Sequence, residues 1–469
     1  MIGWAPRPYR PVLVALAILG LLLPQACLSS PPQLAAPVAA QSADVYVSPS
    51  GNDANPGTQA QPLRTIQRAV NAVSAGGAVT IRGGTYHETV DVARSGTAGR
   101  PITISGYPGE RPLIDGANSL PAGAEDGSPP LFRISGSYVT VSDLEIANSL
   151  GMGVLVTGSN NVVRNLHVHH CREDGIIVSG SGADNLVENS DVWSNCLSNV
   201  NGSRGRWGIG LGAVRHPTRT TLRGNRVYNN WGEGLSAFDA DHTTIEGNTV
   251  YDNYAVNIYL DNAPYTVVQR NLIYSTDPAY YKAPGIGFCD EDYGHPATTH
   301  DVRIVNNLVL GGNRGFFFWL QRSEGGLKNA VIAHNTFANS DGQALLLILD
   351  CQHQNSRIEN NIFLQEDTLP IAELCDSREL RFRNNVWSKA PPANAMGLGS
   401  IVANPQLART GATGPGRLAA DWFRLLARSP AIDRAVLISE VSTDYAGRAR
   451  GSSPDCGGWE YQTFSRLTH

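Results

Sequence analysis

The stretch LRGNRVYNNWGEGLSAFDADHTTIEGNTVY, residues 222–251, contains one phrase twice, first as LRGNRVY and then, 23 residues later, as IEGNTVY. Similar phrases, of the form x-Asn-x-apolar or once with Asp in place of Asn, occur on both sides of it. The steps between successive anchor residues are 22, 24, 36, 23, 23, 36, 28, 26 and 24 residues. A repeat of this length predicts a solenoid, in which each coil stacks on its neighbours. The anchors are Asp143, Asn165, Asn189, Asn225, Asn248, Asn271, Asn307, Asn335, Asn361 and Asn385.

A second phrase, which follows the anchors by about nine residues, predicts the strands of the solenoid. It consists of a leader residue, mostly Gly, and a short apolar run. Because side chains alternate along a strand, the first and third residues after the leader should point inward and the second and fourth outward. An Asn at a turn can donate and accept hydrogen bonds along the stack, which predicts an amide ladder. The leaders are Gly153, Gly175, Gly208, Gly234, Asn257, Gly285, Gly315 and Ala344.

The composition also favours an all-β chain. With 49 Gly and only 16% charged residues, the chain is typical of proteins with many short strands and tight turns. A leucine-rich repeat would show Leu at fixed spacings and a helical back side, and neither is visible. Residues 65–73, TIQRAVNAV, are the exception, because Ile66, Ala69 and Val70 share one helical face. We expect this short helix to cap the open N-terminal end of the solenoid.

The first 27 residues predict an export signal. Arg7 and Arg10 precede an apolar run, residues 12–23, that is too short for a comfortable membrane span. The signal ends in LPQAC, which resembles a bacterial lipobox and makes Cys27 a candidate lipidation site. Lipid anchoring at the cell surface and simple secretion are both open alternatives.

After the signal peptide, residues 1–27, the predicted domains are a flexible linker, residues 28–43, the β-helix, residues 44–400, and a C-terminal cap segment, residues 401–469. The net charge is −5, and no Lys/Arg block follows residue 30. Nucleic acid is therefore not an expected partner. We expect an extracytoplasmic monomer that touches a membrane only through a lipid anchor.

The cysteines leave two questions of pairing open. Cys351 and Cys375 lie 24 residues apart, about one coil, and each precedes an Asn anchor by ten residues. They should therefore stack as neighbours, and Cys171 and Cys196 are nearly in phase too. An exported chain can oxidise both pairs, but buried free thiols are the alternative, and the sequence alone does not decide between them.

Residues 46–90, YVSPSGNDANPGTQAQPLRTIQRAVNAVSAGGAVTIRGGTYHETV, resemble the N-terminal cap and first coils of secreted pectate-lyase-like β-helix proteins, including the family nine polysaccharide lyases. The phrases SPAID (429–433), TDYAGR (443–448) and CGGWEY (456–461) are similar to the terminal segment of many exported bacterial β-helix proteins. The resemblance implies an all-β, single-stranded right-handed parallel β-helix solenoid with a short N-terminal capping helix. It also implies the family nine chemistry of a lysine base and a calcium site of clustered aspartates, but the DDG-type phrases of those lyases do not occur here in recognisable order.

Counting five residues from the leaders brings polar residues from distant stretches into one predicted column, formed by Asp239, Asn262 and Asp290. Asp261 lies beside this column at the fourth, outward position. With coils about 4.8 Å apart, Asp239 should lie about 5 Å from Asp261 and about 10 Å from Asp290. The shorter distance suits a shared Ca2+ ion, and the longer one is near the upper limit for the acid pair of an inverting glycosidase. The predicted metal ligands are Asp239, Asp261, Asp290 and Asp292.

Aromatic and charged residues near this column are suited to binding a polysaccharide. For a lyase we propose Lys282 as the base, with Tyr259 or His242 as substitutes, and Arg314 or calcium as the stabilising cation. The alternative is that the outward aromatic side chains pack under a neighbouring loop. The predicted catalytic residues are Lys282, Asp239, Asp261, Asp290 and Arg314, and the predicted substrate-binding residues are Glu233, Phe238, Tyr259, Trp319 and Arg322.

Two insertions, residues 196–207 and 289–301, frame this patch, and long loops on a rigid scaffold often carry function. A separate polar run, HVHHCRED at residues 167–174, has alternate His residues but no evident third metal ligand. Hydrogen bonding at a turn is the favoured role for that run.

Three functions remain open at this point. The leading prediction is an extracellular polysaccharide lyase or related uronate-modifying enzyme with an acidic, calcium-binding groove. The second is a glycoside hydrolase that uses an Asp pair. The third is a surface solenoid that binds glycans without catalysis.

Overall fold

The computed structural model describes residues 44–122, 129–203, 207–280, 283–291, 299–320, 326–349 and 351–462, with only the backbone at Trp319 and Leu320. The solenoid belongs to one compact unit, residues 41–469. The predicted export signal, Cys27 and the linker lie outside the described residues. So do three predicted site residues, which are Lys282, Asp292 and Arg322.

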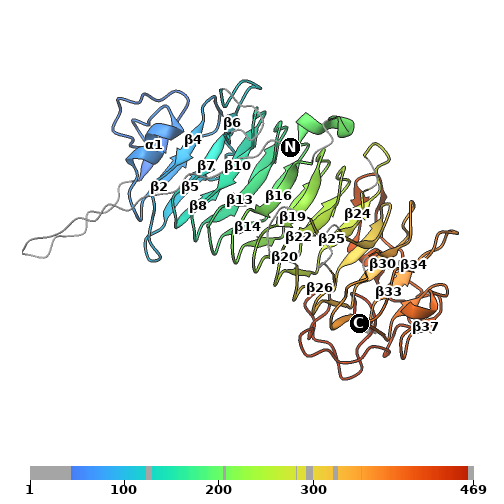
Figure 1. Cartoon of the computed structure of the whole chain (residues 1–469). Helices are drawn as coiled ribbons and strands as arrows, with labels where there is room; N and C mark the ends of the chain where they lie inside the picture. The colour runs from blue at the N-terminus through green and yellow to red at the C-terminus, as the bar shows by residue number, and fades with distance from the viewer. Residues whose placement is uncertain are drawn as a thin grey trace, which may run out of the picture. The chain divides into compact units, whose positions relative to one another are not determined.

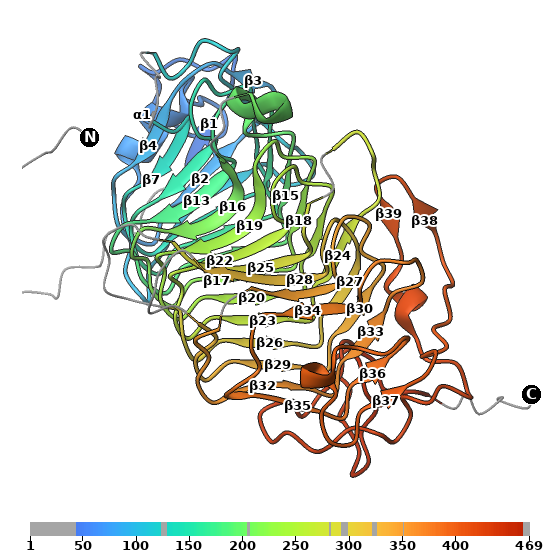
Figure 2. The ribbon, with the colours of Figure 1, turned by 45° about the vertical axis from the view of Figure 1, so that its right-hand side comes forward.

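The described residues form three sheets that run the length of the solenoid, and each full coil contributes one strand to each sheet (Figures 1 and 2). Sheet 1 contains β1 (Val45–Val47), β2 (Ala78–Ile81), β5 (Ile102–Gly106), β8 (Val139–Ser142), β11 (Val162–Arg164), β14 (Leu186–Glu188), β17 (Thr221–Arg223), β20 (Thr244–Glu246), β23 (Val267–Gln269), β26 (Arg303–Val305), β29 (Val331–Ala333), β32 (Ser356–Glu359) and β35 (Leu380–Arg383).

Sheet 2 contains β3 (Thr85–Tyr86), β6 (Leu113–Asp115), β9 (Glu145–Ala147), β12 (His167–His169), β15 (Asp191–Trp193), β18 (Arg226–Tyr228), β21 (Thr249–Tyr251), β24 (Leu272–Ser275), β27 (Leu308–Gly311), β30 (Thr336–Ala338), β33 (Ile362–Leu364), β36 (Val386–Trp387) and β37 (Ile401–Val402). Sheet 3 contains β4 (Val90–Val92), β7 (Phe132–Ile134), β10 (Val154–Val156), β13 (Ile176–Ser179), β16 (Ile209–Val214), β19 (Glu233–Phe238), β22 (Ile258–Asp261), β25 (Ile286–Asp290), β28 (Phe316–Leu320), β31 (Leu346–Ile348) and β34 (Ala372–Leu374).

Successive strands in all three sheets pair in parallel, as in β19 with β22 and β22 with β25. The prediction of an all-β parallel β-helix is therefore confirmed. The remaining elements are the helix α1 (Ile66–Ala72), the 3-10 helices η1 (Leu197–Gly202), η2 (Ala393–Ala395) and η3 (Ala420–Phe423), and the antiparallel pair β38 (Thr413–Gly414) and β39 (Arg417–Leu418).

The inward positions of the strands form one continuous apolar core. In sheet 3 the first positions after the leaders, Leu235, Ile258 and Ile286, are fully buried and belong to this core. Near the C-terminal end the rings of Phe363 and Trp387 stack at 4.3 Å. Burial of each such side chain stabilises the fold by about 1.5–3 kcal/mol. A strand turned over would expose its apolar residues and lose this stabilisation, so the core determines which face of each strand points inward.

The predicted amide ladder is present from Asn225 to Asn385. Each side-chain Nδ2 donates to the Oδ1 of the next Asn at 2.9 to 3.1 Å. Asn248, for example, also donates to the backbone carbonyl of Leu222 at 2.9 Å. The ladder thus satisfies backbone groups that are buried at this turn.

The three earliest anchors are wrong by one residue. Asp143, Asn165 and Asn189 have left-handed backbone conformations, with φ of 62°, 52° and 51°, and lie one residue before the ladder position. In these coils the ladder position is occupied by Leu144, Leu166 and Ser190. Among these side chains only that of Ser190 extends the ladder. Its N–H donates to Asn225 Oδ1, and its hydroxyl accepts from the Leu166 N–H. The phrase was misassigned because Asn favours both the left-handed turn and the ladder.

Two leaders are also misplaced. Ile176 pairs with Leu211, so Gly210, and not Gly208, is equivalent to Gly175. Phe316 pairs with Leu346, so Leu345 replaces Ala344. In the first case β16 begins two residues earlier than its neighbour β13, directly after the insertion of residues 196–207, and a Gly-Ile-Gly-Leu sequence offers two equally plausible leaders.

A second amide ladder, which the sequence analysis missed, lies at the turn between sheets 2 and 3. Asn195 donates to Asn230 at 3.1 Å, and Asn230 donates to Asn253 at 2.9 Å. Asn253 then donates to Asn257 at 3.0 Å. This ladder holds the chain just before the strands of sheet 3, so it fixes the position from which the outer face of that sheet begins.

Helix α1 lies at the N-terminal end of the solenoid, as predicted (Figure 1). The Thr65 side chain accepts a hydrogen bond from the Arg68 N–H, and the Glu88 carboxylate accepts from the N–H groups of Ile66 and Gln67 at 2.8 Å each. Its buried face joins the core. One strand, β1, precedes the helix and pairs with β2, which the sequence analysis did not anticipate.

The C-terminal segment, residues 403–462, packs along the outer side of the coils. Trp422, Phe423 and Trp459 share one buried apolar cluster with Tyr251 and with Tyr274 of sheet 2. The Tyr274 hydroxyl donates to the carbonyl of Gly416 at 3.2 Å. The segment therefore covers the side of the solenoid where sheet 2 would otherwise expose aromatic rings.

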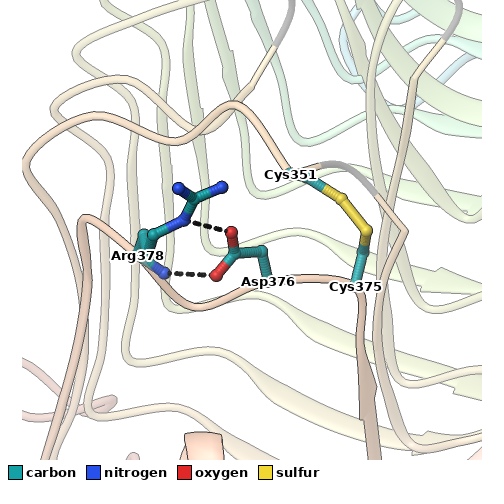
Figure 3. The surroundings of a disulfide bond; sticks show 4 residues. All are labelled: Cys351, Cys375, Asp376 and Arg378. Atoms are coloured by element: carbon teal, nitrogen blue, oxygen red, sulfur yellow. Dashed lines mark hydrogen bonds and ion pairs between the residues drawn. A yellow bond between two sulfur atoms is a disulfide. The ribbon is translucent and has the colours of Figure 1, made fainter.

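Cys351 and Cys375 form a disulfide with Cα atoms 5.6 Å apart (Figure 3). Asp376, next to it, accepts hydrogen bonds from the backbone and guanidinium of Arg378. Cys171 and Cys196 are buried free thiols, so for this pair the alternative reading holds. In the part of the chain that the structure describes, no helix is long and apolar enough to cross a membrane.

Candidate functional site

The strand register places the predicted acidic column as expected. Phe238 pairs with Asp261, and Asp261 pairs with Cys289. The next residues, Asp239, Asn262 and Asp290, therefore share one column. Its member in the preceding coil is Arg215, whose N–H bonds the Phe238 carbonyl; the misplaced leader had hidden this residue.

The three predicted members of the column do not, however, form a common pocket, and none of them lines the hollow of the outer face. Asp239 and Asn262 have φ of 49° and 48°, which ends the alternation of the strand. Asp239 faces His216, with Oδ2 3.2 Å from Nδ1. Asp290 is fully buried and accepts a hydrogen bond from the Thr299 N–H at 2.5 Å. Of this column only Arg215 lines the groove of sheet 3, so the three predicted members do not build it.

The hollow of sheet 3 lies instead over the second and fourth positions of its strands. It has a volume of about 730 Å3 and reaches from Arg133 on β7 to Asp261 on β22. Five strand spacings separate those two strands, so the groove is about 24 Å long along the solenoid axis. Its apolar floor includes Leu155, Ile177 and Phe238. A groove of this length and shape suits an extended polymer that lies across the strands.

Four carboxyl groups line this groove. Asp174 and Glu233 precede their leaders, Asp261 occupies the fourth position of β22, and Glu291 follows β25. The Asp174 carboxylate accepts a hydrogen bond from the Ile209 N–H at 2.7 Å. The sequence analysis assigned only two of the four to the site, because Asp174 was grouped with the His run and Glu291 lies just beyond a strand.

Asp261 is fixed by its neighbour Asn262 and by the next coil. Its Oδ1 accepts hydrogen bonds from the Glu291 N–H at 2.9 Å and from the Asn262 side chain at 3.1 Å. The Asn262 side chain also donates to the Glu291 carbonyl at 3.2 Å. Asn262 therefore supports the site as a positioning residue and does not line it.

Two of these acids have raised pKa values. Burial raises the pKa of Asp261 to about 8, and the nearby carboxylates of Glu291 and Glu233 add to the rise. Burial likewise raises the pKa of Glu233 to about 8, although the hydrogen bond from the Ser236 hydroxyl opposes the shift. Both groups are thus predominantly protonated at neutral pH, and a protonated carboxyl in a groove can donate a proton.

The aromatic residues of the outer face occupy the outward positions of their strands, but two of them are covered. Tyr259 is 6% exposed and Phe317 is 4% exposed, and both belong to a small apolar cluster with Cys289. The Tyr259 hydroxyl donates to Glu291 Oε1 at 2.8 Å. Phe238 remains partly exposed in the groove, whereas the Trp319 side chain lies outside the described residues.

Arg314 lies at the far end of the same face. It precedes the leader Gly315, as predicted, and lines a smaller pocket together with Glu233 and Tyr259. Its guanidinium lies over the Phe317 ring at 5.3 Å, and its Nε donates to Gln343. His242, one of the substitute bases, does not line either hollow; it stacks on Tyr265 at 4.5 Å.

The predicted calcium ligands do not fit a shared ion. Within the described residues no three Asp, Glu, His or Cys side chains are grouped closely enough to hold a metal ion. Asp239 points to His216, and Asp290 points inward, so only Asp261 of the described set faces the groove. Asp292 lies outside the described residues. The described residues therefore give calcium no role in the proposed reaction.

The His run belongs to a different face. His167 and His169 lie on β12 of sheet 2, and His169 is 3.1 Å from Glu145. The His169 ring stacks on Trp193 at 4.2 Å. A turn separates these residues from Asp174, which faces sheet 3, so the polar run HVHHCRED is divided between two faces.

The solenoid places the chain in the class of right-handed parallel β-helix proteins. The family model "Pel9A-like, right handed beta helix region" matches residues 45–264, and the model "Right handed beta helix region" matches residues 198–386. The chain belongs to the pectate-lyase-like right-handed parallel β-helix superfamily.

Two relatives and one solved structure illustrate the likeness. The uncharacterized protein YwoF of Bacillus subtilis is 30% identical over 370 residues, which cover 69% of this chain and 75% of that protein. Pectate lyase PEL9 of Emericella nidulans is 32% identical over 212 residues, which cover 42% of this chain and 50%, about half, of the lyase. The crystal structure of pectate lyase Pel9A has a TM-score of 0.59 at 19% identity and covers 90% of this chain and 97% of its own, which shows the shared fold.

Proposed function

We propose that this chain is an extracellular polysaccharide lyase, or a related uronate-modifying enzyme, whose substrate lies along the groove of sheet 3. The observation that carries the proposal is the groove itself, about 730 Å3, with carboxyl groups and arginines on one rigid face. The relatives named pectate lyases support the reaction class. The predicted export signal and Cys27 support secretion or surface anchoring.

A lyase needs a base that removes the proton α to a uronate carboxylate and a cation that stabilises the resulting negative charge. Lys282 remains our proposed base; two residues later Pro284 lines the smaller pocket. Arg215 and Arg314 are the candidate cations, because one lines each hollow. Burial raises the pKa of the Tyr259 hydroxyl above its usual value, which favours a role as proton donor to the leaving oxygen over a role as base.

The test is to incubate the purified chain, without its signal, with a panel of uronate and neutral polysaccharides. Absorbance of unsaturated products and formation of reducing ends are measured separately. We expect both signals on a uronate polymer, and Lys282→Met should abolish them. Lys389→Met, which removes a lysine from a distant loop, is the matched control. Binding without either signal would instead support the non-catalytic solenoid.

A glycoside hydrolase is the second candidate, favoured by the spacing of Glu233 and Asp261; in that reaction one of them acts as the protonated acid and the other, ionised, as the base. The Glu233 carboxyl accepts a hydrogen bond from the Ser236 hydroxyl. Ser236 pairs with Tyr259 on the next strand, and Asp261 lies two residues further along that strand. Strand geometry places the two carboxyl groups roughly 8 Å apart. That distance falls within the roughly 6.5–9.5 Å of inverting glycosidases. Reducing ends without unsaturated products, lost in Glu233→Gln, would favour the hydrolase over the lyase.

A further inference from the structure

The turn before the first amide ladder binds the C-terminal segment in the last four ladder coils. In these coils the residue before the ladder Asn has a left-handed backbone conformation, with φ between 51° and 60°. Its side chain bonds to backbone atoms of the segment: Asn306 donates to the Thr443 carbonyl at 2.8 Å, and Asn384 donates to the Arg434 carbonyl at 2.7 Å. We call these four residues the docking column. Its members are Asn306, His334, Asn360 and Asn384.

The two central members of the docking column form a hydrogen bond of fixed direction. The Val436 N–H donates to Asn360 Oδ1 at 3.0 Å, and Asn360 Nδ2 donates to the Val436 carbonyl at 2.8 Å. A flipped amide would place two donors and two acceptors face to face, so these bonds set its orientation. Asn360 Nδ2 also lies 2.9 Å from His334 Nε2. That ring nitrogen must therefore accept, and it carries no proton.

The other ring nitrogen of His334 also has a fixed role. His334 Nδ1 lies 3.1 Å from the Asp455 carbonyl, which can only accept, so Nδ1 carries the proton. The fully buried ring is therefore a neutral imidazole that joins the solenoid to two separate parts of the C-terminal segment. A second proton, on Nε2, would face the Asn360 amide group. Asn360 could avoid it only by turning over, which would break both bonds to Val436.

The surroundings of His334 oppose a second proton. Burial lowers the pKa of His334 well below its ordinary value of 6.5, and the Arg450 guanidinium lowers it further. Arg450 is held near the ring because it donates to the carbonyls of Asp455 and Gly457 at 3.1 and 2.9 Å. The Cys456 thiol, between these two residues in sequence, is neutral because burial raises its pKa. His334 is thus neutral while the segment is docked.

The carboxyl groups beside Arg450 have the opposite dependence on pH. Burial raises the pKa values of Asp455 and Glu460. Both groups therefore hold a proton more readily when the segment is docked than when it is released, so acid favours docking through them. His334 has a lowered pKa when docked, so acid favours release through it. The sign of the pH dependence consequently distinguishes the histidine from its acidic neighbours.

We propose that His334 is an acid-sensitive switch, which releases residues 434–461 from the solenoid when Nε2 takes up a proton. Docking is complete above pH 6.5, the ordinary pKa of a histidine that has left the site. Below that pH the released fraction should grow about tenfold per pH unit for as long as the docked ring stays neutral. Release withdraws Trp459 from the apolar cluster on sheet 2. The switch is independent of the reaction proposed for the groove, because it acts on a different sheet.

Hydrogen exchange of the purified chain, read by mass spectrometry at pH 7, 6 and 5, tests the switch. Protection is corrected for the pH dependence of intrinsic exchange. We expect protection of residues 434–461 to fall by up to about tenfold per pH unit below pH 6.5, while the strands of sheet 3 keep theirs. His334→Gln should remove this decline, because an amide offers one donor and one acceptor but does not titrate. His353→Gln is the matched control, since His353 is also buried and accepts from the Leu327 N–H at 3.3 Å.

Three results would overturn the switch: constant protection from pH 7 to 5, an equal decline in His334→Gln, or an equal loss of protection in sheet 3, which would mean global unfolding. If His334→Gln is released at every pH, Asn360→Asp decides the question. Its carboxylate can accept from a protonated Nε2, so acid should no longer release the segment in this variant. A decline as steep as that of the parent would contradict the switch.

Discussion

Sheets 2 and 3 are built from the same repeat, but their outer faces differ. On sheet 2 the rings of Tyr228, Tyr251 and Tyr274 stack at 4.8 and 4.6 Å, and the C-terminal segment covers the last two. On sheet 3 the equivalent face is left open as a groove lined by Glu233 and Asp261. Both sheets have the same regular backbone. The position of the candidate site therefore depends on which sheet face the C-terminal segment leaves uncovered.

The difference shows in the polar groups as well. On sheet 2 Asp191 lies 3.4 Å from Arg226, so its charge is balanced locally. On sheet 3 burial raises the pKa of Asp261 to about 8, and the neighbouring acids Glu291 and Glu233 add to the rise. A carboxylate paired with a cation stays ionised and stabilises the fold. Acids with raised pKa values in a cavity stay protonated and can donate the proton to a substrate.

The largest expected effect follows from this contrast. In the glycoside hydrolase, where they are the acid and the base, Glu233→Gln or Asp261→Asn should lower turnover on the accepted polymer by about 100-fold or more, because general acid–base groups contribute that much. Asp191→Asn on sheet 2 should leave turnover within about twofold. Initial rates by product absorbance or reducing ends provide the measurement. Equal losses in all three variants would mean that the two faces do not differ in function.

The next prediction concerns stability. Phe423, fully buried between the C-terminal segment and sheet 2, should cost about 3–5 kcal/mol of unfolding free energy when changed to Ala. Phe238→Ala, on the open groove, should cost much less and should impair substrate binding instead. Denaturant unfolding and a binding assay on both variants check this. A Phe238 variant that is as unstable as the Phe423 variant would show that the groove is part of the packed core.

Much of the fold could be predicted from the sequence because its signals are local and repeated. The Asn anchors, the leaders and the strand parity each recur in many coils, so an error in one coil does not change the architecture. The errors fell where one residue type serves two roles: Asn165 at a left-handed turn resembled a ladder residue, and Gly208 resembled the leader Gly210.

The site was harder to predict because it depends on what happens at strand ends. Register alone placed Asp239 and Asp290 in one column with Asn262, but the turn after Asp239 and the inward parity of Asp290 remove both side chains from the groove. Asp174 precedes its leader as Glu233 does, so the repeat could have found it, whereas Glu291 follows β25 at a position that no repeat marks. The rule that side chains alternate between inward and outward, applied to the fifth position of β25, would have excluded Asp290 from the predicted site on sequence alone.

The amide ladder, which supports both faces equally, predicts a moderate effect. Asn248→Ala leaves partners of its side chain unpaired, among them the carbonyl of Leu222 and Asn271 Oδ1. The expected cost is about 1–3 kcal/mol of unfolding free energy. Asn248→Ser should cost less, since Ser190 occupies the same ladder position in an earlier coil. Urea unfolding midpoints of the two variants provide the comparison, and a more stable Ala variant would contradict a supporting role for the ladder.

The smallest expected effect is the pH dependence of stability, because each groove acid changes the unfolding free energy by at most about 1.4 kcal/mol within one pH unit. Glu233 and Asp261 have folded-state pKa values of about 8, above their ordinary values of 4.5 and 3.8. Between those limits the folded state binds more protons than the unfolded state, so stability should fall as pH rises from about 4.5 to 8. Glu233→Gln should flatten this decline, while Glu440→Gln should not, because hydrogen bonds from Ser439 and Arg357 hold the pKa of Glu440 at about 2. Unfolding midpoints measured at pH 5, 6, 7 and 8 separate the two cases, and a slope that Glu233→Gln leaves unchanged would place the stored proton elsewhere in the molecule.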